Sequence, residues 1–192
     1  MKLQTIEDGE AAQPPTQISA PTGIVQLYTG TGKGKTTAAL GLGLRAAGHG
    51  WKVLVIQFMK GKINYGELQS VKHIPGMSIE QFGRPDFVDK DNPAQVDIDL
   101  AVQGFQRAKE AISSEEYNML ILDEINVAVD FKLLDVTDVL ELVENRPPNL
   151  DMVLTGRYAP RALVDLADLV TVMAEVKHPY AQGIDARQGI DF

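Results

Sequence analysis

TGTGKGKTT occupies residues 29–37, between an apolar run at 24–28 and a stretch rich in small, helix-forming residues at 36–47. A strand, a glycine-rich loop and a helix in this order are the context that a phosphate-binding loop requires. The glycines let backbone N–H groups turn inward to form an anion-binding nest, and the N-terminus of the following helix adds about half a positive charge. The pattern therefore predicts a site for nucleotide phosphates.

Two positions of this loop have expected roles, and a third departs from the consensus. Lys35 is expected to reach the outer phosphates and the Thr36 hydroxyl to hold Mg²⁺. The consensus G-x-x-x-x-G-K-[ST] has a glycine where this chain has Thr29, so we expect the loop to follow a path different from that of common NTPases. The alternative is a glycine-rich turn with unrelated lysines, and the Gly-Lys-Thr-Thr run at a strand-to-helix junction argues against it.

Composition limits the class of protein. The chain has 192 residues, 44% hydrophobic and 23% charged, which suits one soluble domain with its own core. A net charge of −8 and a pI near 4.9 argue against a dedicated DNA or RNA binder. The absence of cysteine excludes disulfides, thiol catalysis and cysteine-ligated zinc. No apolar run approaches the roughly 20 residues of a membrane span, and no signal pattern begins the chain, so we expect a cytoplasmic protein.

Hydrophobic patterning predicts an α/β fold with a parallel sheet covered by helices on both faces. Strands are expected at 24–29, 52–58, 77–82, 118–122, 151–155 and 169–173, and helices at 36–47, 64–71, 93–114, 126–130, 135–144 and 161–167. Gly41 and Gly43 inside helix 36–47 indicate close packing against the sheet. Asn92 is expected to cap helix 93–114 and Pro93 to open it. The expected buried face of that helix consists of Ala101, Gly104, Phe105, Ala108 and Ile112. Residues 23–192 form the predicted domain. Residues 1–22 are polar and proline-containing, and are either a tail without fixed structure or an arm that orders against a partner subunit or a ligand.

A second chemical motif lies at residues 118–124, where an apolar strand ends in Asp123 and Glu124. An acid at the tip of such a strand is the Walker B pattern, and it would support Mg²⁺ directly or through water. The alternative is an ordinary acidic helix start. The spacing does not decide which of the two carboxylates contacts the metal.

Cations follow two of the predicted strands. Arg157 comes after strand 151–155, and Lys60 and Lys62 come after strand 52–58. Ligands of open α/β sheets bind at the carboxyl ends of the strands, so Arg157 is a candidate phosphate or transition-state cation. A loop lysine is usually solvated, although Lys60 or Lys62 could meet phosphate. Arg45, on the helix leaving the loop, is either a surface charge or a ligand contact, and its position alone favours the surface.

Together these motifs resemble the P-loop type of ATP:corrinoid adenosyltransferase. The resemblance extends from about residue 24 to 192 and rests on several stretches: 28–39, 48–50, 57–61, 66–67, 122–124, 155–157, 176–178 and 189–192. The lysine between the last two glycines of the loop is the most specific of these features. A phosphate loop alone is shared by thousands of NTPases, whereas this ordered set is far narrower.

The resemblance implies a single RecA-like domain with a six-stranded, mostly parallel sheet, and a homodimer. It also implies transfer of the 5′-deoxyadenosyl group of ATP to Co(I) of a reduced corrinoid, with release of triphosphate, in adenosylcobalamin synthesis or salvage. Mg²⁺ or Mn²⁺ is the expected cofactor, and a flavoprotein reductase is a candidate partner. In the family the N-terminal segment closes over a neighbouring subunit's site, but residues 1–22 match that segment poorly.

The resemblance also assigns residues. The triphosphate would be held by Gly30, Thr31, Gly32, Lys33, Gly34, Lys35, Thr36 and Thr37. Thr36 and Glu124, with Asp123 beside them, would hold the metal, and Lys35 and Arg157 would stabilise the leaving triphosphate. Arg45 matches a family residue near the nucleotide, which reverses the preference for a surface role. Phe87 is the aromatic candidate for the corrin ring, because the tryptophan that better-known members carry in that loop is missing here.

Two other functions fit a phosphate loop. The first is a P-loop kinase or RecA-like ATPase that acts on another small molecule, and the second is a nucleotide-dependent switch without catalysis. Kinases of this size usually have an arginine-rich lid, whereas the arginines of this chain are scattered. Adenosyl transfer is therefore the favoured function.

Overall fold

The computed structural model describes residues 22–61 and 65–191, so the predicted N-terminal arm lies outside the described residues except for Thr22. The strands are β1 (Val25–Thr29), β2 (Val53–Phe58), β3 (Met77–Phe82), β4 (Met119–Asp123), β5 (Asp151–Thr155) and β6 (Leu169–Val172). They form one sheet in the order β3-β2-β4-β5-β1-β6, and every neighbouring pair is parallel. The predicted α/β class and six-stranded sheet are confirmed, and the described sheet is wholly parallel.

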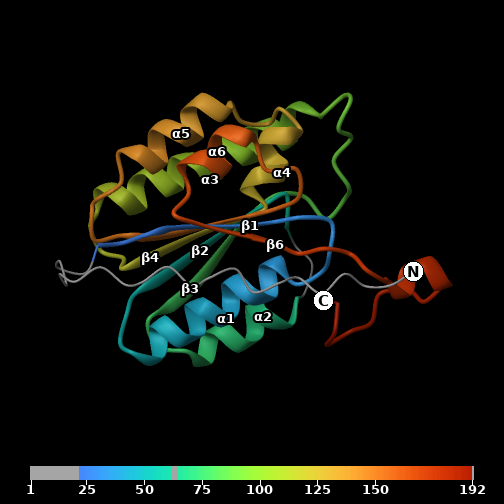
Figure 1. Cartoon of the computed structure of the whole chain (residues 1–192), viewed down its shortest axis with the longest axis horizontal. Coiled ribbons are helices and arrows are strands. Elements are labelled where there is room, and N and C mark those ends of the chain that lie inside the picture. The colour runs from blue at the N-terminus through green and yellow to red at the C-terminus, as the bar shows by residue number, and fades with distance from the viewer. Residues whose placement is uncertain (1–21, 62–64, 192) are drawn as a thin grey trace, which may run out of the picture.

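Helices cover both faces of this sheet, as expected. They are α1 (Lys35–Gly48), α2 (Gly66–Ser70), α3 (Gln95–Ser113), α4 (Ile125–Asp130), α5 (Val136–Glu144) and α6 (Arg161–Leu166), with 3-10 turns η1 (Val71–His73) and η2 (Pro179–Gln182). Figure 1 shows α3, α4, α5 and α6 on one face and α1 and α2 on the other. None of the helices in the described part is long and apolar enough to cross a membrane.

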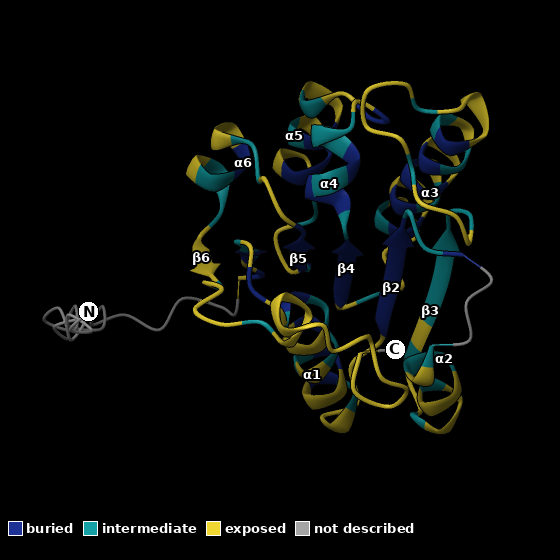
Figure 2. Cartoon of the chain, turned by 90° about the vertical axis from the view of Figure 1, so that its right-hand side faces the viewer, coloured by how far each residue is buried: buried dark blue, intermediate teal, exposed yellow. Residues whose placement is uncertain are grey.

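The core is divided by the sheet because successive side chains of a strand point to opposite faces. In β2, Leu54, Ile56 and Phe58 join the larger cluster under α3 to α6, whereas Val53 and Val55 join a smaller cluster under α1. All six residues of β2 and all five of β4 are buried, which Figure 2 shows in dark blue. The central strands therefore provide a rigid base for whatever follows their carboxyl ends.

Helix α1 packs closely on the sheet through one of its two internal glycines. A Cβ at Gly43 would come within 3.0–3.3 Å of Met77, Ile121 and Val53, so only glycine fits there without displacement. Gly41 is exposed, and a Cβ there would meet nothing within 4 Å. The expectation of close packing is confirmed for Gly43 and wrong for Gly41, because the helical period turns residues two apart to different sides.

The start of α3 differs from the prediction. Asn92 and Pro93 were expected to cap and open this helix, but it begins at Gln95 with Ala94 as its capping residue. The backbone N–H of Asn92 instead bonds the side chain of Asp89 within the preceding loop. Local side-chain bonding of this kind competes with helix initiation. Of the predicted buried face, Ala101, Gly104, Phe105 and Ala108 are buried, and Ile112 is partly buried against the larger core cluster.

Candidate active site

A cavity of about 1210 Å³ lies at the carboxyl ends of the strands. One wall comes from the phosphate loop and from the residues that follow β2, β4 and β5. Helix α2, η1 and β3 form a second wall, and the C-terminal segment 178–191 forms a third. Because every strand is parallel, the predicted motifs after β1, β4 and β5 meet at this one edge, as expected for ligand sites of open α/β sheets.

The loop itself turns at its glycines. Gly34 has φ of 117° at the N-terminus of α1, and Gly30 has φ of 97°. A Cβ at Gly30 would lie 2.4 Å from the Met173 carbonyl oxygen, so the backbone approach there requires glycine. Thr29 is not among the residues with positive φ, and its Oγ1 accepts from the Ala159 N–H at 3.4 Å. The missing consensus glycine is thus explained: the turn is made one residue later.

The first half of the loop is also held by hydrogen bonds to the chain after β6. The Gly32 N–H donates to the Met173 carbonyl at 2.7 Å, and the Met173 N–H donates to the Thr29 carbonyl at 2.8 Å. Cavity-lining residues begin at Gly32 and continue to Thr37, whereas Gly30 and Thr31 lie outside the lining. The donors that face the cavity are therefore those of the second half of the loop.

Lys35 is the buried lysine of the loop, with 7% of its surface exposed. Its Nζ donates to the carbonyls of Gly30 at 2.9 Å and Gly32 at 2.7 Å, which keeps it against the cavity floor. Burial lowers the pKa of Lys35, and the Arg157 charge lowers it further, while Glu124 and Asp123 oppose that shift. A poorly solvated ammonium in this place favours an anionic ligand.

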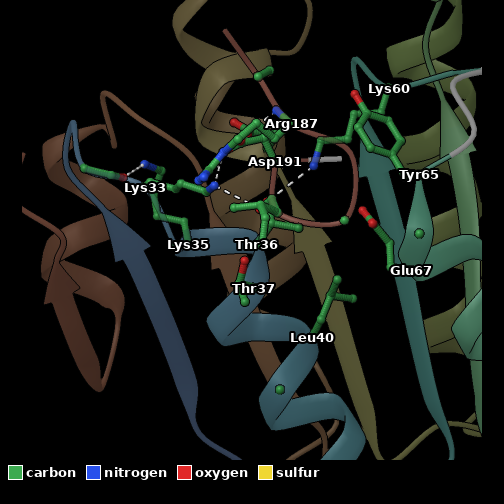
Figure 3. Close-up of a pocket in the computed structure, with 18 of the residues that line it drawn as sticks. Lys33, Lys35, Thr36, Thr37, Leu40, Lys60, Tyr65, Glu67, Arg187 and Asp191 are labelled. Atoms are coloured by element: carbon green, nitrogen blue, oxygen red, sulfur yellow. Dashed lines mark hydrogen bonds and ion pairs between the residues drawn. The ribbon is translucent and has the colours of Figure 1, made fainter. Parts of the chain in front are cut away.

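Lys33 points elsewhere. Its Nζ forms an ion pair with Asp191 and donates to the Ile190 carbonyl at 2.9 Å, so it joins the loop to the C-terminal segment. Figure 3 shows Lys33 beside Asp191 and Arg187 at this rim. Lys33 is therefore a rim cation rather than a cation of the cavity floor.

Asp123 ends β4, as predicted, and is fully buried. Its carboxylate accepts four hydrogen bonds, from Thr36 Oγ1 at 2.8 Å, Thr155 Oγ1 at 2.7 Å, Gln57 Nε2 at 3.1 Å and Lys60 Nζ at 2.7 Å. A carboxylate offers about four lone pairs, so these donors occupy all of them. Asp123 fixes the Thr36 hydroxyl at the cavity and does not itself line it.

Glu124 follows at the start of α4 with φ of 64°, and its backbone N–H donates to Thr155 Oγ1 at 3.0 Å. Glu124 also lines the cavity. Burial, then the neighbouring Asp123, raises the pKa of this carboxyl group, while Lys60, Lys35 and Arg157 oppose the shift. Glu124 is thus the acid of the Walker B pair that a ligand can reach.

Sequence comparison adds the family. A model of the family "ATP:corrinoid adenosyltransferase BtuR/CobO/CobP" matches residues 21–192. The chain belongs to this family. It is 37% identical to the corrinoid adenosyltransferase of Sinorhizobium sp. over 88% of this chain and 80% of the relative. It is 35% identical to that of Escherichia coli K12 over 88% and 86%, and 33% identical to corrinoid adenosyltransferase CobA of Salmonella typhimurium over 92% and 89%.

Structural comparison supports the fold of this family member. The KaiC-like protein PH0186 from Pyrococcus horikoshii OT3 superposes with a TM-score of 0.53 over 82% of this chain and 76% of its own. The two sequences are 16% identical, so the likeness shows the fold alone. It agrees with the RecA-like sheet that the family resemblance implies.

Of three other predicted site residues of this adenosyltransferase-family chain, one lines the cavity and two do not. Arg157 lines the cavity directly after Gly156, which has φ of 135°. Arg45 is exposed on α1, near Tyr28, and is not among the lining residues. Phe87 is fully exposed in the loop between β3 and α3 and also lies outside the lining. The roles of Arg45 and Phe87 stay predictions.

Sequence reasoning left one part of the cavity open and missed another. For Lys60 it allowed either a solvated position or a phosphate contact, and the side chain is only 17% exposed and pairs with Asp123, while Lys62 lies outside the described residues. The C-terminal wall, with Arg187 and Asp191, gave no periodic signal because it consists of loop and one short 3-10 turn. One sequence signal pointed to Lys60, its position close after an apolar strand. In the fold, that strand lies next to the strand that ends in Asp123.

The oxygen donors at the cavity fit Mg²⁺ or Mn²⁺ bound together with phosphate. Within residues 22–61 and 65–191, no three His, Asp or Glu side chains gather into a metal cluster. Mg²⁺ usually takes one or two protein oxygens and completes its shell with phosphate oxygens and water. The Thr36 hydroxyl and the Glu124 carboxylate, both at the cavity, are a donor set of that kind.

Proposed function

We propose that this chain transfers the 5′-deoxyadenosyl group of ATP to Co(I) of a reduced corrinoid and releases triphosphate. One observation carries the proposal within the family: the phosphate loop opens into a cavity of about 1210 Å³. That volume exceeds the roughly 300–1,000 Å³ of ordinary small-molecule sites. The wall opposite the loop includes apolar Ile74, Met77 and Ile79, which suits a second, larger substrate beside the nucleotide.

The reaction is a displacement at carbon. The cobalt electron pair forms the Co–C5′ bond, the C5′–O bond breaks, and its electron pair leaves on the triphosphate oxygen. Co(I) is a strong nucleophile, so no side chain has to remove a proton. The N–H groups of loop residues 33–37, with Lys35 and Arg157, would stabilise the charge that grows on triphosphate. Holding C5′ against cobalt supplies the remaining advantage.

Mg²⁺ or Mn²⁺ would be held by Thr36 and Glu124, with Asp123 orienting the Thr36 hydroxyl. When bound, the ion would draw charge from the triphosphate oxygens. Glu124 then acts as a metal ligand, because displacement at carbon has no water to activate.

Phe87 is proposed to contact the corrin ring. Its side chain is fully exposed, so a contact with a flat ligand would displace no core packing. The base of its loop is held by Arg84, whose guanidinium makes two 2.7 Å hydrogen bonds to the buried Asp97 carboxylate. Anchoring at the base would position the exposed aromatic tip.

A homodimer, a flavoprotein reductase that supplies Co(I), and a cytoplasmic location complete the proposal. The edge strand β6 exposes Leu169, Val170 and Val172, and an apolar surface of this kind supports an interface with a second copy. Which corrinoid is accepted, complete cobalamin or a precursor, would follow from assays with each.

The test is the spectral change of chemically reduced cobalamin on addition of ATP and the protein, with and without Mg²⁺. We expect the adenosylcobalamin spectrum and one intact triphosphate per product. Formation of ADP or phosphate without adenosylcobalamin would instead identify a kinase or ATPase.

A further inference from the structure

Lys60 has an unusual position for a lysine that follows a strand. Met59, directly after β2, has φ of 57°, a conformation that L-residues seldom adopt. Gly61 and Gly83 approach so closely that a Cβ on Gly61 would lie 1.9 Å from the Gly83 carbonyl oxygen. The backbone on both sides of Lys60 is therefore fixed by the exits of β2 and β3.

The ammonium of Lys60 contacts Asp123 at the end of β4 and Thr36 of the phosphate loop. Its Nζ lies 2.7 Å from Asp123 Oδ2 and 3.3 Å from Thr36 Oγ1, and it stands 5.7 Å from the centre of the Tyr65 ring. Figure 3 shows the side chain reaching toward Thr36 from the neighbouring strand. Burial alone would lower the pKa of Lys60, but the Asp123 and Glu124 carboxylates raise it above the usual value.

Within the part of the chain that the structure describes, Lys60 keeps one hydrogen-bond donor for a ligand. An ammonium has three donors, and Asp123 and Thr36 take two of them. Among residues 22–61 and 65–191, no third hydrogen-bond acceptor is present, and the residue lines the cavity beside the phosphate loop. The Thr36 hydroxyl has given its own hydrogen to Asp123, so its oxygen faces Lys60 as an acceptor.

In ordinary P-loop NTPases, the loop hydroxyl and the Walker B aspartate hold Mg²⁺. In this chain a lysine ammonium already lies against both groups, and Asp123 has no lone pair left to offer. The Lys60 ammonium and a bound Mg²⁺ would therefore contact neighbouring parts of the triphosphate.

We infer that Lys60 is a built-in cation of the triphosphate site, which binds a phosphate oxygen directly and lets nucleotide bind without a divalent ion. This inference rests on the proposed function only in naming triphosphate as the leaving group. Charge-assisted hydrogen bonds to phosphate are among the stronger polar contacts, so the effect on binding should be large.

The competing explanation is that Lys60 only neutralises Asp123. Removing one partner of a buried pair leaves an uncompensated charge, which disturbs a site without any ligand contact. The two explanations separate when Lys60 is changed in a background where residue 123 has no charge, since Asp123→Asn keeps the shape and removes the need for neutralisation.

The experiment measures binding of inorganic triphosphate and of ATP by calorimetry, in EDTA and in excess Mg²⁺. The proteins are wild type, Lys60→Met, Asp123→Asn and the double variant. Lys52→Met serves as the matched control, because Lys52 is 58% exposed and pairs with Glu116 at the surface. Thermal melting reports whether each variant folds.

We expect Lys60→Met to weaken metal-free triphosphate binding by about fivefold or more in both the wild-type and the Asp123→Asn backgrounds. The loss should be smaller in excess Mg²⁺, and Lys52→Met should match wild type. A loss of less than about fivefold between Asp123→Asn and the double variant overturns the inference, and that comparison decides even if Lys60→Met alone does not fold.

This result is independent of the reaction catalysed. If reduced cobalamin with ATP and wild-type protein gives ADP, the proposed function fails while the Lys60 result stands. If adenosylcobalamin forms and Lys60→Met binds triphosphate normally in the Asp123→Asn background, the function stands and this inference fails.

Discussion

Two walls of the same cavity are built in different ways. The wall at the sheet ends consists of buried polar groups that bond one another, with Asp123, Thr155 and Gln57 fully buried. The C-terminal wall, residues 178–191, is largely exposed and is held to the loop by surface contacts such as the Lys33–Asp191 ion pair. Arg187 adds a second exposed contact to Asp191.

The difference separates two tasks. Buried pairs are costly to break and hold their groups in one geometry, whereas exposed pairs contribute little because water and salt replace them. The sheet wall can therefore hold its polar groups in place at the phosphates. The contacts of the C-terminal wall can break and re-form at low free-energy cost when substrates enter. Four substitutions test this contrast.

Asp123→Ala should have the largest effect on stability. It leaves Lys60 as an unpaired cation in a mostly buried place and removes the acceptor of four donors, so we expect a loss of about 3–5 kcal/mol. Urea unfolding followed by circular dichroism measures it. A loss similar to that of Asp191→Asn would contradict the contrast between the two walls.

Lys35→Ala should remove product formation while the fold is retained. Losing one preorganised charge at the leaving group typically costs about 10²–10³-fold in rate. The cobalamin assay measures the rate, and melting with circular dichroism confirms folding. Unchanged turnover would refute the phosphate role of this lysine.

Glu124→Gln should change stability with pH. A raised native pKa means that the unfolded chain loses this proton first, so the wild type loses stability as pH rises from the unfolded value of 4.5 to the raised native value, and then stays constant. The variant lacks this loss. We expect its melting temperature to exceed that of wild type at pH 8 and to approach it near pH 4, while its need for Mg²⁺ increases.

An equal melting temperature of Glu124→Gln and wild type at every pH would show that burial of this carboxylate is harmless. Glu144→Gln, on the exposed end of α5, is a matched control for the chemical change itself.

Asp191→Asn should have the smallest effect. The Lys33–Asp191 pair is solvent-exposed, so the melting temperature should stay within about 1 °C of wild type. A modest rise in KM for ATP with unchanged kcat is expected if the C-terminal wall only assists binding. A large loss of stability would show that this wall is structural.

Several features of the site followed from sequence because they depend on local pattern. The Gly34-Lys35-Thr36 run and the apolar strand ending in Asp123 are set by neighbouring residues, and both were found in the predicted elements. The start of α3 was misplaced because Asn92 bonds within its own loop, a choice that propensity does not reveal. Lys60 was undervalued because its partners lie 24 and 63 positions away along the chain.

The sequence alone determined the class of fold, the phosphate loop and the family, since these follow from periodicity and from contiguous motifs. Tertiary structure alone decided which carboxylate faces the cavity, where Lys33 and Lys60 point, and that the C-terminal segment forms a wall. The physical reason is that a parallel sheet brings distant strand ends to one edge, and only their packing there determines which charges pair.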